Sequence, residues 1–326
     1  MPDPFDILDE LTPERFCSGE ALAGRYGVSR MAVWKAIQRL ESLGVPIDKV
    51  RGRGYRLARP IERLHVDEIR RSTAPACLEM LNDLQVVPVL GSTNRHLSEA
   101  FKPHQAVRAA VLAEFQTDGR GRRGRRWISP FAANIYLSLR WQFHAPATAL
   151  GLLSLAVASE LAAELARQGL SDHGVKWPND LYWQGRKLGG LLLELAGEQQ
   201  GPCAVVIGLG LNWSMPVAVA AEIDQPWADI QTAMGPGAPG RNALAGLALT
   251  ALISACQRYA QSGFEGFAEQ WEAHDLVKGQ LVDVHQGDRV TRGRVLGIDT
   301  QGRLELACED RVLRFSSGEV SVRTAQ

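Results

Sequence analysis

The chain has 326 residues, more than one hydrophobic core usually holds, so two or three domains are expected. Its 36 Lys and Arg are balanced by 36 Asp and Glu, and its 45% hydrophobic content is that of a globular protein. No run approaches the roughly 18 apolar residues of a membrane span, and the acidic start MPDPFDILDELTPERF is unlike a basic secretion signal. A cytoplasmic protein without a membrane contact is therefore expected.

The cysteines and histidines are scattered along the chain. No CxxC pair and no zinc-finger spacing occurs among Cys17, Cys77, Cys203, Cys256 and Cys308. We expect reduced cysteines that serve in packing. A metal held by His and Cys, or a mechanism based on histidine, is not expected.

Two short helices and a hairpin are predicted for CSGEALAGRYGVSRMAVWKAIQRLESLGVPIDKVRGRGYRLARP, residues 17–60. Ser18 and Ser29 can each cap a helix, and Gly27 and Gly44 can end them. The apolar face is expected at Ala21, Leu22 and Tyr26 in the first helix, and at Val33, Ile37 and Leu40 in the second.

Two helices joined by a tight turn form a helix-turn-helix, and a hairpin with a basic bend is typical of the wing of a winged helix. Residues 25–59 hold nine Lys and Arg against two acidic residues, so nine minus two gives a formal excess of +7. Base readout is expected from Arg30, and phosphate contacts from the wing. The predicted DNA-binding residues are Ser29, Arg30, Ala32, Val33, Lys35, Arg51 and Arg53. A module that contacts protein is the alternative.

Strands alternate with helices from about residue 61 to residue 271. The segments VVPVLG, AAVLAEFQ, NIYLSLRW, DLYW, LLLEL and AVVIGLG have strand-like composition and are mostly bounded by turn formers. LGLLSLAVASELAAELARQ and NALAGLALTALISACQRYA are helix-like. An α/β or α+β catalytic domain with a central sheet is predicted. Function is expected in four unusual loops, GSTN, QTDGRGRRGRRWISP, KWPNDLYWQGRKLGG and IGLGLN.

The arginine loop, residues 118–127, holds five arginines and three glycines. Glycine lets backbone N–H groups approach an oxyanion, and guanidinium groups match phosphate or carboxylate. GRGRRG is neither a P-loop nor a dinucleotide fingerprint in its strand-turn-helix setting. A solvated basic loop or a second nucleic-acid patch is the alternative.

The segment KWPND brings Lys176, Asn179 and Asp180 close to a proline, and Lys187 follows a turn predicted at residues 184–185. Two lysines, a carboxylate and an amide suit a reaction that builds charge on a phosphate and then delivers an amine. A surface salt bridge between Lys187 and Asp180 is the alternative. The aromatic residues of the segment are equally typical of core positions: Trp177 and Trp183.

With its four loop motifs in this order behind a winged helix, the chain resembles the bifunctional biotin protein ligases that also repress the biotin operon. The resemblance implies a multidomain α+β fold: a winged helix-turn-helix over residues 1–61, a mixed α/β ligase domain with a class II synthetase-like sheet over 62–275, and an SH3-like β-barrel over 276–326. The chain departs from the family pattern at Asp118 and Gly189.

Residues carried over from the family motifs form three sets. The resemblance implies biotin binding by Ser92, Thr93, Gln116, Gly119, Arg120, Arg122, Lys187, Gly190 and Gly208. It implies ATP binding by Trp127, Asn179 and Asn212, and catalysis by Arg122, Lys176, Asp180 and Lys187. No residue is assigned to a protein-held metal, since Mg²⁺ is expected to arrive with ATP.

The activity implied is formation of biotinyl-5′-AMP from biotin and MgATP, followed by transfer of biotin to a lysine of the biotin carboxyl carrier protein of acetyl-CoA carboxylase. The arginine loop is expected to be mobile when empty and to fold over the adenylate. The resemblance also implies binding to operator DNA as a homodimer promoted by biotinyl-AMP. The exposed edge strand LLLELA, residues 191–196, is the candidate contact, with a central core strand as the alternative.

Other classes of function compete with this interpretation. One is a ligase without repression, and another is a transcription factor whose middle domain only senses a small molecule. Lys176, Asp180 and Lys187 argue against a mere sensor, which needs no adenylation chemistry. A lipoate or octanoyl ligase shares the architecture, but GRGRRGRRW fits biotin ligases better.

Overall fold

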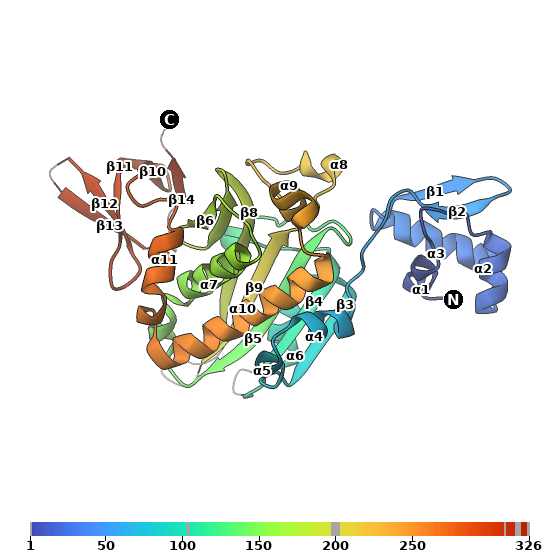
Figure 1. The fold of residues 1–326 in the computed structure, drawn as a ribbon, viewed down its shortest axis with the longest axis horizontal. Coiled ribbons are helices and arrows are strands. Elements are labelled where there is room, and N and C mark those ends of the chain that lie inside the picture. Colours follow the sequence, from blue (N-terminus) through green and yellow to red (C-terminus); the bar gives the residue numbers. More distant parts are fainter. Residues whose placement is uncertain (1, 103–104, 197–202, 310, 317–320, 325–326) are drawn as a thin grey trace.

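A computed structural model describes residues 2–102, 105–196, 203–309, 311–316 and 321–324. The chain forms an elongated molecule, with an N-terminal helical domain at one end, a large mixed sheet in the middle and a small antiparallel sheet at the other end (Figure 1). The sheets within the described residues have two, seven and five strands. The three domain ranges predicted above are consistent with this order, and their exact boundaries remain a prediction.

The N-terminal domain is a winged helix-turn-helix. Its elements are α1 (Pro4–Asp9), α2 (Gly19–Tyr26), α3 (Arg30–Ser42), β1 (Ile47–Val50) and β2 (Gly54–Leu57). Ser18 Oγ accepts a hydrogen bond from the Ala21 amide at 3.0 Å, and Ser29 Oγ accepts one from the Ala32 amide at 3.2 Å. Both predicted N-caps are therefore confirmed.

The core of this domain follows the predicted helical spacing with one change. Leu22 and the three apolar residues predicted for the second helix are buried. Ala21 is exposed, however, and Ala23 is buried in its place. A helix turns about 100° per residue, so a shift of two positions moves a side chain to the opposite face.

The central domain alternates strands and helices. Its strands are β3 (Asp83–Leu90), β4 (Ala109–Gln116), β5 (Asn134–Phe143), β6 (His173–Lys176), β7 (Asp180–Trp183), β8 (Arg186–Ala196) and β9 (Cys203–Asn212). Its α-helices are α4 (Val66–Ser72), α5 (Pro75–Leu78), α6 (Thr93–Ala100), α7 (Leu153–Arg167), α8 (Val217–Ala220), α9 (Ile230–Met234), α10 (Arg241–Ser262) and α11 (Ala268–His274). Short 3-10 turns lie at Arg122–Gly124, Ala147–Leu150, Gly235–Gly237 and Glu265–Phe267.

The seven strands are ordered β3-β4-β5-β9-β8-β7-β6, with β3 and β4 parallel and the other neighbours antiparallel. Long helices α7 and α10 cover one face (Figure 1). There, Leu137 and Leu139 of β5 belong to one buried core with Leu161 of α7 and Leu249 of α10. The opposite face of the sheet carries α6. Because side chains alternate along a strand, the other half of the side chains of each strand point to this face.

The C-terminal domain is a five-stranded antiparallel sheet of order β13-β12-β11-β10-β14. Its strands are β10 (Leu281–Gln286), β11 (Arg289–Ile298), β12 (Leu304–Cys308), β13 (Arg311–Phe315) and β14 (Ser321–Thr324). These pairings form a small antiparallel sheet domain, in agreement with the predicted fold class.

The segment that follows the wing is fixed to the central domain by hydrogen bonds. Glu62 Oε2 accepts from the Arg241 amide at 2.9 Å, and Glu62 Oε1 accepts from the Asn242 amide at 2.9 Å. Arg241 also forms a fully buried ion pair with Glu114 at 2.5 Å. Phe5 of α1 stacks on Phe131 of the central domain at 5.9 Å between ring centroids. The N-terminal domain therefore docks on the central domain through packed side chains and an anchored linker.

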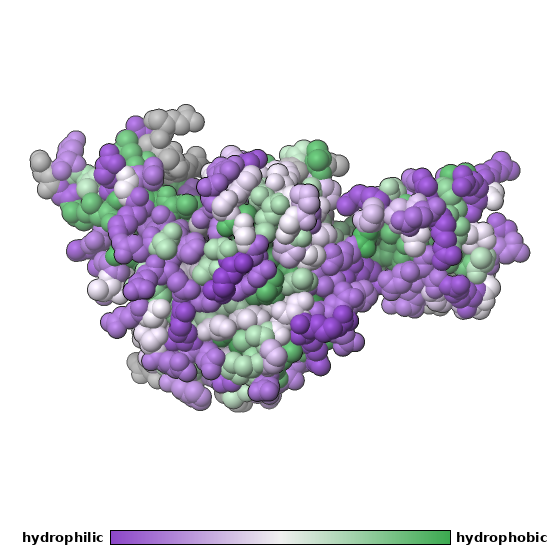
Figure 2. Space-filling view, viewed as in Figure 1, coloured by the Kyte–Doolittle hydropathy of each residue, from purple (hydrophilic) through white to green (hydrophobic). Residues whose placement is uncertain are grey.

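Two helical segments, 147–167 and 241–262, are long and apolar enough to cross a membrane by length and composition. No such segment was expected from the sequence. Of their most apolar windows, 72% and 61% are buried inside the protein. Burial against the sheet accounts for their composition. Figure 2 shows hydrophilic residues over much of the surface, with hydrophobic residues also visible on the C-terminal domain. Its exposed apolar side chains include Leu281, Val290, Leu296 and Val312.

Candidate functional site

A cavity of about 860 Å³ lies on the face of the central sheet opposite α7 and α10. Thirteen of the fourteen residues predicted for biotin, ATP or catalysis line it, and Gly119 is the exception. The thirteen are Ser92, Thr93, Gln116, Arg120, Arg122, Trp127, Lys176, Asn179, Asp180, Lys187, Gly190, Gly208 and Asn212. The fold thus brings four separate sequence motifs to one cavity, while the role of each residue remains a prediction.

The motif IGLGLN, which was predicted to be a loop, instead lies within β9 and builds the floor of this cavity through strand alternation. Leu209 and its neighbours two residues away face the core, whereas Gly208, Gly210 and Asn212 face the cavity. A Cβ at Gly210 would lie 2.4 Å from Trp127 Cε2, closer than side-chain atoms approach. Glycine is therefore required here so that the Trp127 ring can lie directly on the sheet.

The arginine loop is a closed turn at the cavity mouth. The Trp127 amide donates to the Gly119 carbonyl at 2.9 Å, and the Gly121 amide donates to the Arg125 carbonyl at 2.7 Å. A Cβ at Gly119 would lie 2.6 Å from the Trp127 carbonyl oxygen. Gly119 thus allows the two ends of the loop to meet, which gives it a structural role outside the cavity lining.

Arg122 carries the positive charge of the loop into the cavity. Its Nη1 donates to Asn179 Oδ1 at 3.0 Å, which joins the loop to the KWPND segment. Partial burial lowers the pKa of Arg122, and Asp180 nearby opposes that shift. Asp118, one of the two departures from the family pattern, forms an ion pair with Arg95 on the outside, and this pair lowers the pKa of Asp118. Its negative charge is therefore directed away from Arg122.

Lys187 and Asp180 form an ion pair of 2.8 Å inside the cavity. Their side chains are 16% and 26% exposed, so the pair is more shielded than a solvated surface bridge. Asp180 faces Gly190 across the β7–β8 ladder, and a Cβ at Gly190 would lie 2.9 Å from Asp180 Oδ1. The glycine leaves room for the pair. The turn predicted at residues 184–185 is confirmed, with φ of 46° and 76°.

Trp127 and Asn212 present unpaired polar atoms to the cavity. Trp127 Nε1 and Asn212 Oδ1 are buried and have no hydrogen-bond partner among the described residues. Buried donors and acceptors nearly always find a partner, so a ligand that offers both an acceptor and a donor fits this position. Lys187 Nζ lies 5.6 Å from the centroid of the Trp127 ring, which links this end to the ion pair.

Thr93 and Gln116 form the other end of the cavity. Gln116 Oε1 accepts hydrogen bonds from the Thr93 amide at 2.9 Å and from Thr93 Oγ1 at 3.1 Å. Gln116 Nε2 donates to Ser129 Oγ at 3.2 Å, which fixes the orientation of the amide. Ser92 is the N-cap residue of α6 and is buried. These groups can recognise a small polar, uncharged head.

Sequence reasoning missed the segment 222–227, which forms one wall of the cavity. The Lys187 amide donates to the Pro226 carbonyl at 2.9 Å, and the Ala228 amide donates to the Lys187 carbonyl at 2.9 Å. The segment thus adds a short parallel bridge to the strand that carries Lys187. The Pro-Trp pair at 226–227 is the only sequence signal, and it does not specify a partner.

Lys176 packs on an aromatic ring at the cavity wall. Its Nζ lies 4.8 Å from the centroid of the Tyr182 ring. Burial is the main cause that raises the pKa of Tyr182 to about 12, so the ring is neutral near pH 7.

Trp177 is buried, and its Nε1 donates to the Gly302 carbonyl of the C-terminal domain at 3.0 Å. The KWPND segment, whose Trp177–Pro178 peptide is cis, therefore contacts two domains.

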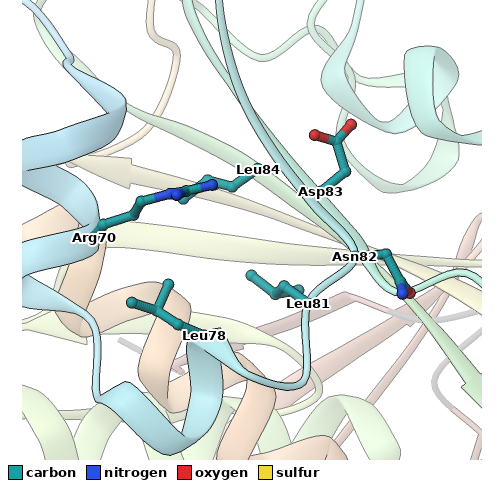
Figure 3. A pocket seen from close by; sticks show the side chains of 6 residues that line it. All are labelled: Arg70, Leu78, Leu81, Asn82, Asp83 and Leu84. Carbon is teal, nitrogen blue, oxygen red and sulfur yellow. The ribbon is translucent and has the colours of Figure 1, made fainter.

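A second cavity of about 130 Å³ lies elsewhere and holds none of the predicted residues. It is lined by Arg70, Leu78, Leu81, Asn82, Asp83 and Leu84 (Figure 3). No group of three His, Cys, Asp or Glu suited to a metal occurs among the described residues. The five cysteines are free, as predicted for packing residues.

The basic surface of the N-terminal domain is exposed, with one correction to the predicted set. Arg30, Lys35, Arg51 and Arg53 are exposed, and the Arg53 guanidinium lies 4.3 Å from the centroid of the Phe16 ring. Val33 is 0% exposed, so its predicted contact with DNA is wrong. The apolar spacing that places Val33 in the core excludes it from the opposite face.

Two residues of α3 that sequence reasoning did not single out face solvent. Met31 is 61% exposed and Trp34 is 46% exposed. They lie away from the buried face of the helix, beside Arg30 and Lys35. The helical spacing of Val33, Ile37 and Leu40 already contained this signal, because it defines the solvent side as well.

Strand β8 is half covered by its neighbours. Its ladder with β9 runs to Ala196, whereas its ladder with β7 ends at Gly190. Beyond that point no described strand covers the second edge, so LLLELA lies partly at a sheet edge. Leu191 is buried and Leu195 is 57% exposed. Both the edge and the core expectation thus hold, for different parts of the same segment.

Models of three domain families match the chain. The HTH domain matches residues 5–56, the biotin/lipoate A/B protein ligase family matches residues 86–212, and the biotin protein ligase C-terminal domain matches residues 279–323.

Similar proteins cover almost the whole chain. The bifunctional ligase/repressor BirA of Salmonella typhimurium is 38% identical over 99% of this chain and 98% of its own length, and that of Escherichia coli is 37% identical over the same shares. The biotin–[acetyl-CoA-carboxylase] ligase of Mycobacterium tuberculosis is 35% identical over 73% of this chain and 88% of its own length. The biotin protein ligase of Aquifex aeolicus, solved with biotin and ATP, superimposes with a TM-score of 0.62 over 75% of this chain and all of that one, at 23% identity.

Proposed function

This chain belongs to the family of bifunctional biotin ligase/repressors, and we propose that it activates biotin as biotinyl-5′-AMP in the cavity of the central sheet and transfers it to a carrier protein. As a member of that family it is a ligase with an HTH domain and repressor activity. The observation that carries the proposal is the convergence of Thr93, Arg122, Trp127, Lys187 and Asn212 on one cavity.

The two ends of the cavity suit the two substrates. Thr93 and Gln116 offer neutral polar groups to the ring head of biotin, and the unpaired atoms of Trp127 and Asn212 suit adenine. Arg122 and Lys187 line the same cavity. In the first step a biotin carboxylate oxygen attacks the α-phosphate of ATP and pyrophosphate leaves. These two cations would offset the negative charge that develops on the phosphate.

Mg²⁺ would enter this cavity with ATP. Mg²⁺ prefers oxygen ligands and is usually held by one or two carboxylates together with substrate phosphates. The carboxylates that line the cavity are Asp180, Glu222 and Asp224. Asp180 is already paired with Lys187 and Glu222 with Arg126, so Asp224 is the better candidate, and the metal would neutralise the departing pyrophosphate.

In the second step a lysine amine of the carrier protein attacks the acyl carbon of the anhydride. An amide bond forms, AMP leaves and the amine loses a proton. Lys187 Nζ contacts Asp180 through Oδ2, at 2.8 Å. The other carboxylate oxygen of Asp180, Oδ1, is the candidate acceptor of that proton. The arginine loop would shield the anhydride from water until the amine arrives. We propose the biotin carboxyl carrier protein of acetyl-CoA carboxylase as the acceptor and the cytoplasm as the location.

For repression we propose that biotinyl-AMP promotes a homodimer through the open edge of β8 and that α3 enters the major groove of operator DNA. A twofold dimer matches a palindromic operator. Support comes from the exposed basic surface and from the free part of the β8 edge. Arg30 would read bases, and Arg51 and Arg53 would contact phosphates.

The first test uses the purified full-length protein with biotin and MgATP, a biotin carboxyl carrier domain and duplex DNA from the promoter of the biotin genes. Transfer of biotin, together with DNA binding that depends on both biotin and MgATP, is expected. Lipoate offered in competition should not be transferred. Lack of biotin transfer would refute the ligase assignment, and transfer without DNA binding would refute the corepressor role.

A further inference from the structure

Asn94, the last residue of the GSTN motif, lies at the cavity but has no group left for a ligand. It is 4% exposed. Its Oδ1 accepts from Ser138 Oγ at 2.6 Å, and its Nδ2 donates to Glu194 Oε2 at 2.8 Å and to the Leu192 carbonyl at 3.3 Å. Both N–H bonds and the amide oxygen are engaged, and two acceptors on one side fix the orientation of the amide.

Towards the cavity, Ser138 connects Asn94 to the end formed by Thr93 and Gln116. Ser138 Oγ lies 2.7 Å from Thr93 Oγ1, which in turn lies 3.1 Å from Gln116 Oε1. A serine hydroxyl has one proton, so it donates either to Thr93 or to Asn94. A ligand that hydrogen-bonds to Thr93 or Gln116 therefore changes what Ser138 can offer to Asn94.

Towards the surface, Asn94 holds the part of β8 that has a free edge. Leu192 and Glu194 follow Gly190, where the ladder with β7 ends. The contact is tight, because a Cβ at Gly208 in the adjacent strand would lie 2.2 Å from Asn94 Oδ1. Asn94 thus connects the cavity, the sheet floor and the open edge through its single side chain.

We propose that Asn94 is a positioning residue that couples occupancy of the Thr93–Gln116 end of the cavity to the shape of the open β8 edge and so governs ligand-dependent self-association. The proposal rests on the biotin site and the β8 dimer proposed above. Coupling between two sites is reciprocal, so changes at the edge that act through Asn94 must also alter biotin affinity.

The test compares full-length variants by sedimentation equilibrium, without ligand and with biotin plus MgATP. The quantity measured is the ratio of the two dimerisation constants. Glu194 does not line the cavity, and Glu194→Ala removes the carboxylate that accepts the hydrogen bond from Asn94 Nδ2. Glu194→Gln retains an amide oxygen that can accept the same hydrogen bond. Leu195→Ala is the matched control, because Leu195 is exposed on the same edge but points to the opposite face of the strand.

Glu194→Ala and Asn94→Ala should each lower this ratio about tenfold, within the usual range of coupling between sites. Glu194→Gln should retain most of it, and Leu195→Ala should change both constants alike. Biotin affinity, titrated by calorimetry, should change with Glu194→Ala and not with Leu195→Ala. An unchanged ratio in Glu194→Ala, or an equal loss in Leu195→Ala, overturns the coupling through Asn94. Absence of ligand-dependent dimers in the unsubstituted protein overturns the β8 dimer itself and this coupling with it.

Discussion

The cavity and the basic surface of the N-terminal domain both depend on cations but hold them differently. In the cavity, Lys187 is 16% exposed and is fixed by Asp180 across a strand ladder. On the N-terminal domain, Arg25 is 59% exposed and pairs with Glu10, while Arg30 lies fully on the surface of α3. Shielded charges interact strongly and are screened little by salt, whereas exposed charges are screened within about 10 Å at 0.1 M salt.

This difference separates two kinds of recognition. The cavity places a few charges at fixed positions, which suits stabilisation of one transition state. The N-terminal surface offers many exposed charges, which suits a long polyanion and gives affinity that falls with salt. Substitutions in the two regions should therefore differ in size and in salt dependence.

The largest effect is expected from Lys187→Ala. Loss of a cation beside the developing phosphate charge should slow adenylate formation by about 10²- to 10³-fold, with little dependence on salt. Release of pyrophosphate from biotin and MgATP measures this rate. Arg186→Ala is the matched control, because the Arg186 side chain stacks on Trp183 and does not line the cavity. Comparable losses in both variants would contradict the assignment of Lys187.

A smaller effect is expected from Arg122→Ala. Loss of its charge-assisted contacts should raise the rate at which biotinyl-AMP leaves the enzyme by about tenfold to 100-fold, with little change in the midpoint of urea unfolding. Single-turnover release of labelled adenylate measures this leakage. Arg71→Ala is the control, since Arg71 is exposed on α4 and does not line the cavity. An unchanged leakage rate in Arg122→Ala would refute a retaining role for this arginine.

Local sequence signals predicted much of this structure. The caps at Ser18 and Ser29 and the turn at 184–185 depend on neighbours in the chain, and they are found as expected. The segment IGLGLN was expected to be a loop but lies within β9, because its apolar residues alternate with glycines as strand residues do. The contact of Trp127 with Gly210 joins distant segments, so the sequence indicated Trp127 and the motif IGLGLN but not that they touch.

Long-range pairs were not predictable in the same way. Glu114 and Arg241 form a buried ion pair although 127 positions separate them. The wall at 222–227 is held by backbone hydrogen bonds between Lys187 and residues 226 and 228, which almost any residue could supply. Val33 was assigned both to the core and to DNA, and only the burial of the folded domain decides between them.

Substitutions on the basic surface should act on DNA binding in two different ways. Arg30→Ala should cost about 1–3 kcal/mol of discrimination against altered operator bases. Arg51→Ala should weaken binding to all sequences alike and reduce the slope of log affinity against log salt by about one. Fluorescence anisotropy with operator and mutated duplexes, at several salt concentrations, measures both quantities. A change in salt slope without loss of base discrimination in Arg30→Ala would reassign it to phosphate contact.

The smallest effect is expected from protonation within the central domain. Burial lowers the pKa of His173, whose Nε2 lies 2.8 Å from the Ala162 carbonyl and whose ring lies 5.6 Å from that of His274; Asp172 nearby opposes the shift. The unfolded chain therefore takes up a proton more readily than the folded protein as the pH falls below about 6.5. Stability present above that pH should be lost as the pH drops towards the folded pKa.

Urea unfolding at pH 7.5 and at more acidic pH tests this sign. His173→Gln should reduce the loss of stability on acidification, whereas substitution of the exposed His144 by Gln should leave it unchanged. An identical loss in His173→Gln and in the unsubstituted protein would show that other groups cause the acid sensitivity.

The anchored linker would limit which spacings between operator half-sites the protein can bind. Glu62 is fixed by Arg241 and Asn242, and Phe5 stacks on Phe131, so α3 keeps a set orientation relative to the central sheet. In a dimer formed across β8, the distance between the two α3 helices would then be fixed. Operators whose half-site spacing differs from that distance by half a helical turn of DNA would engage only one of the two helices.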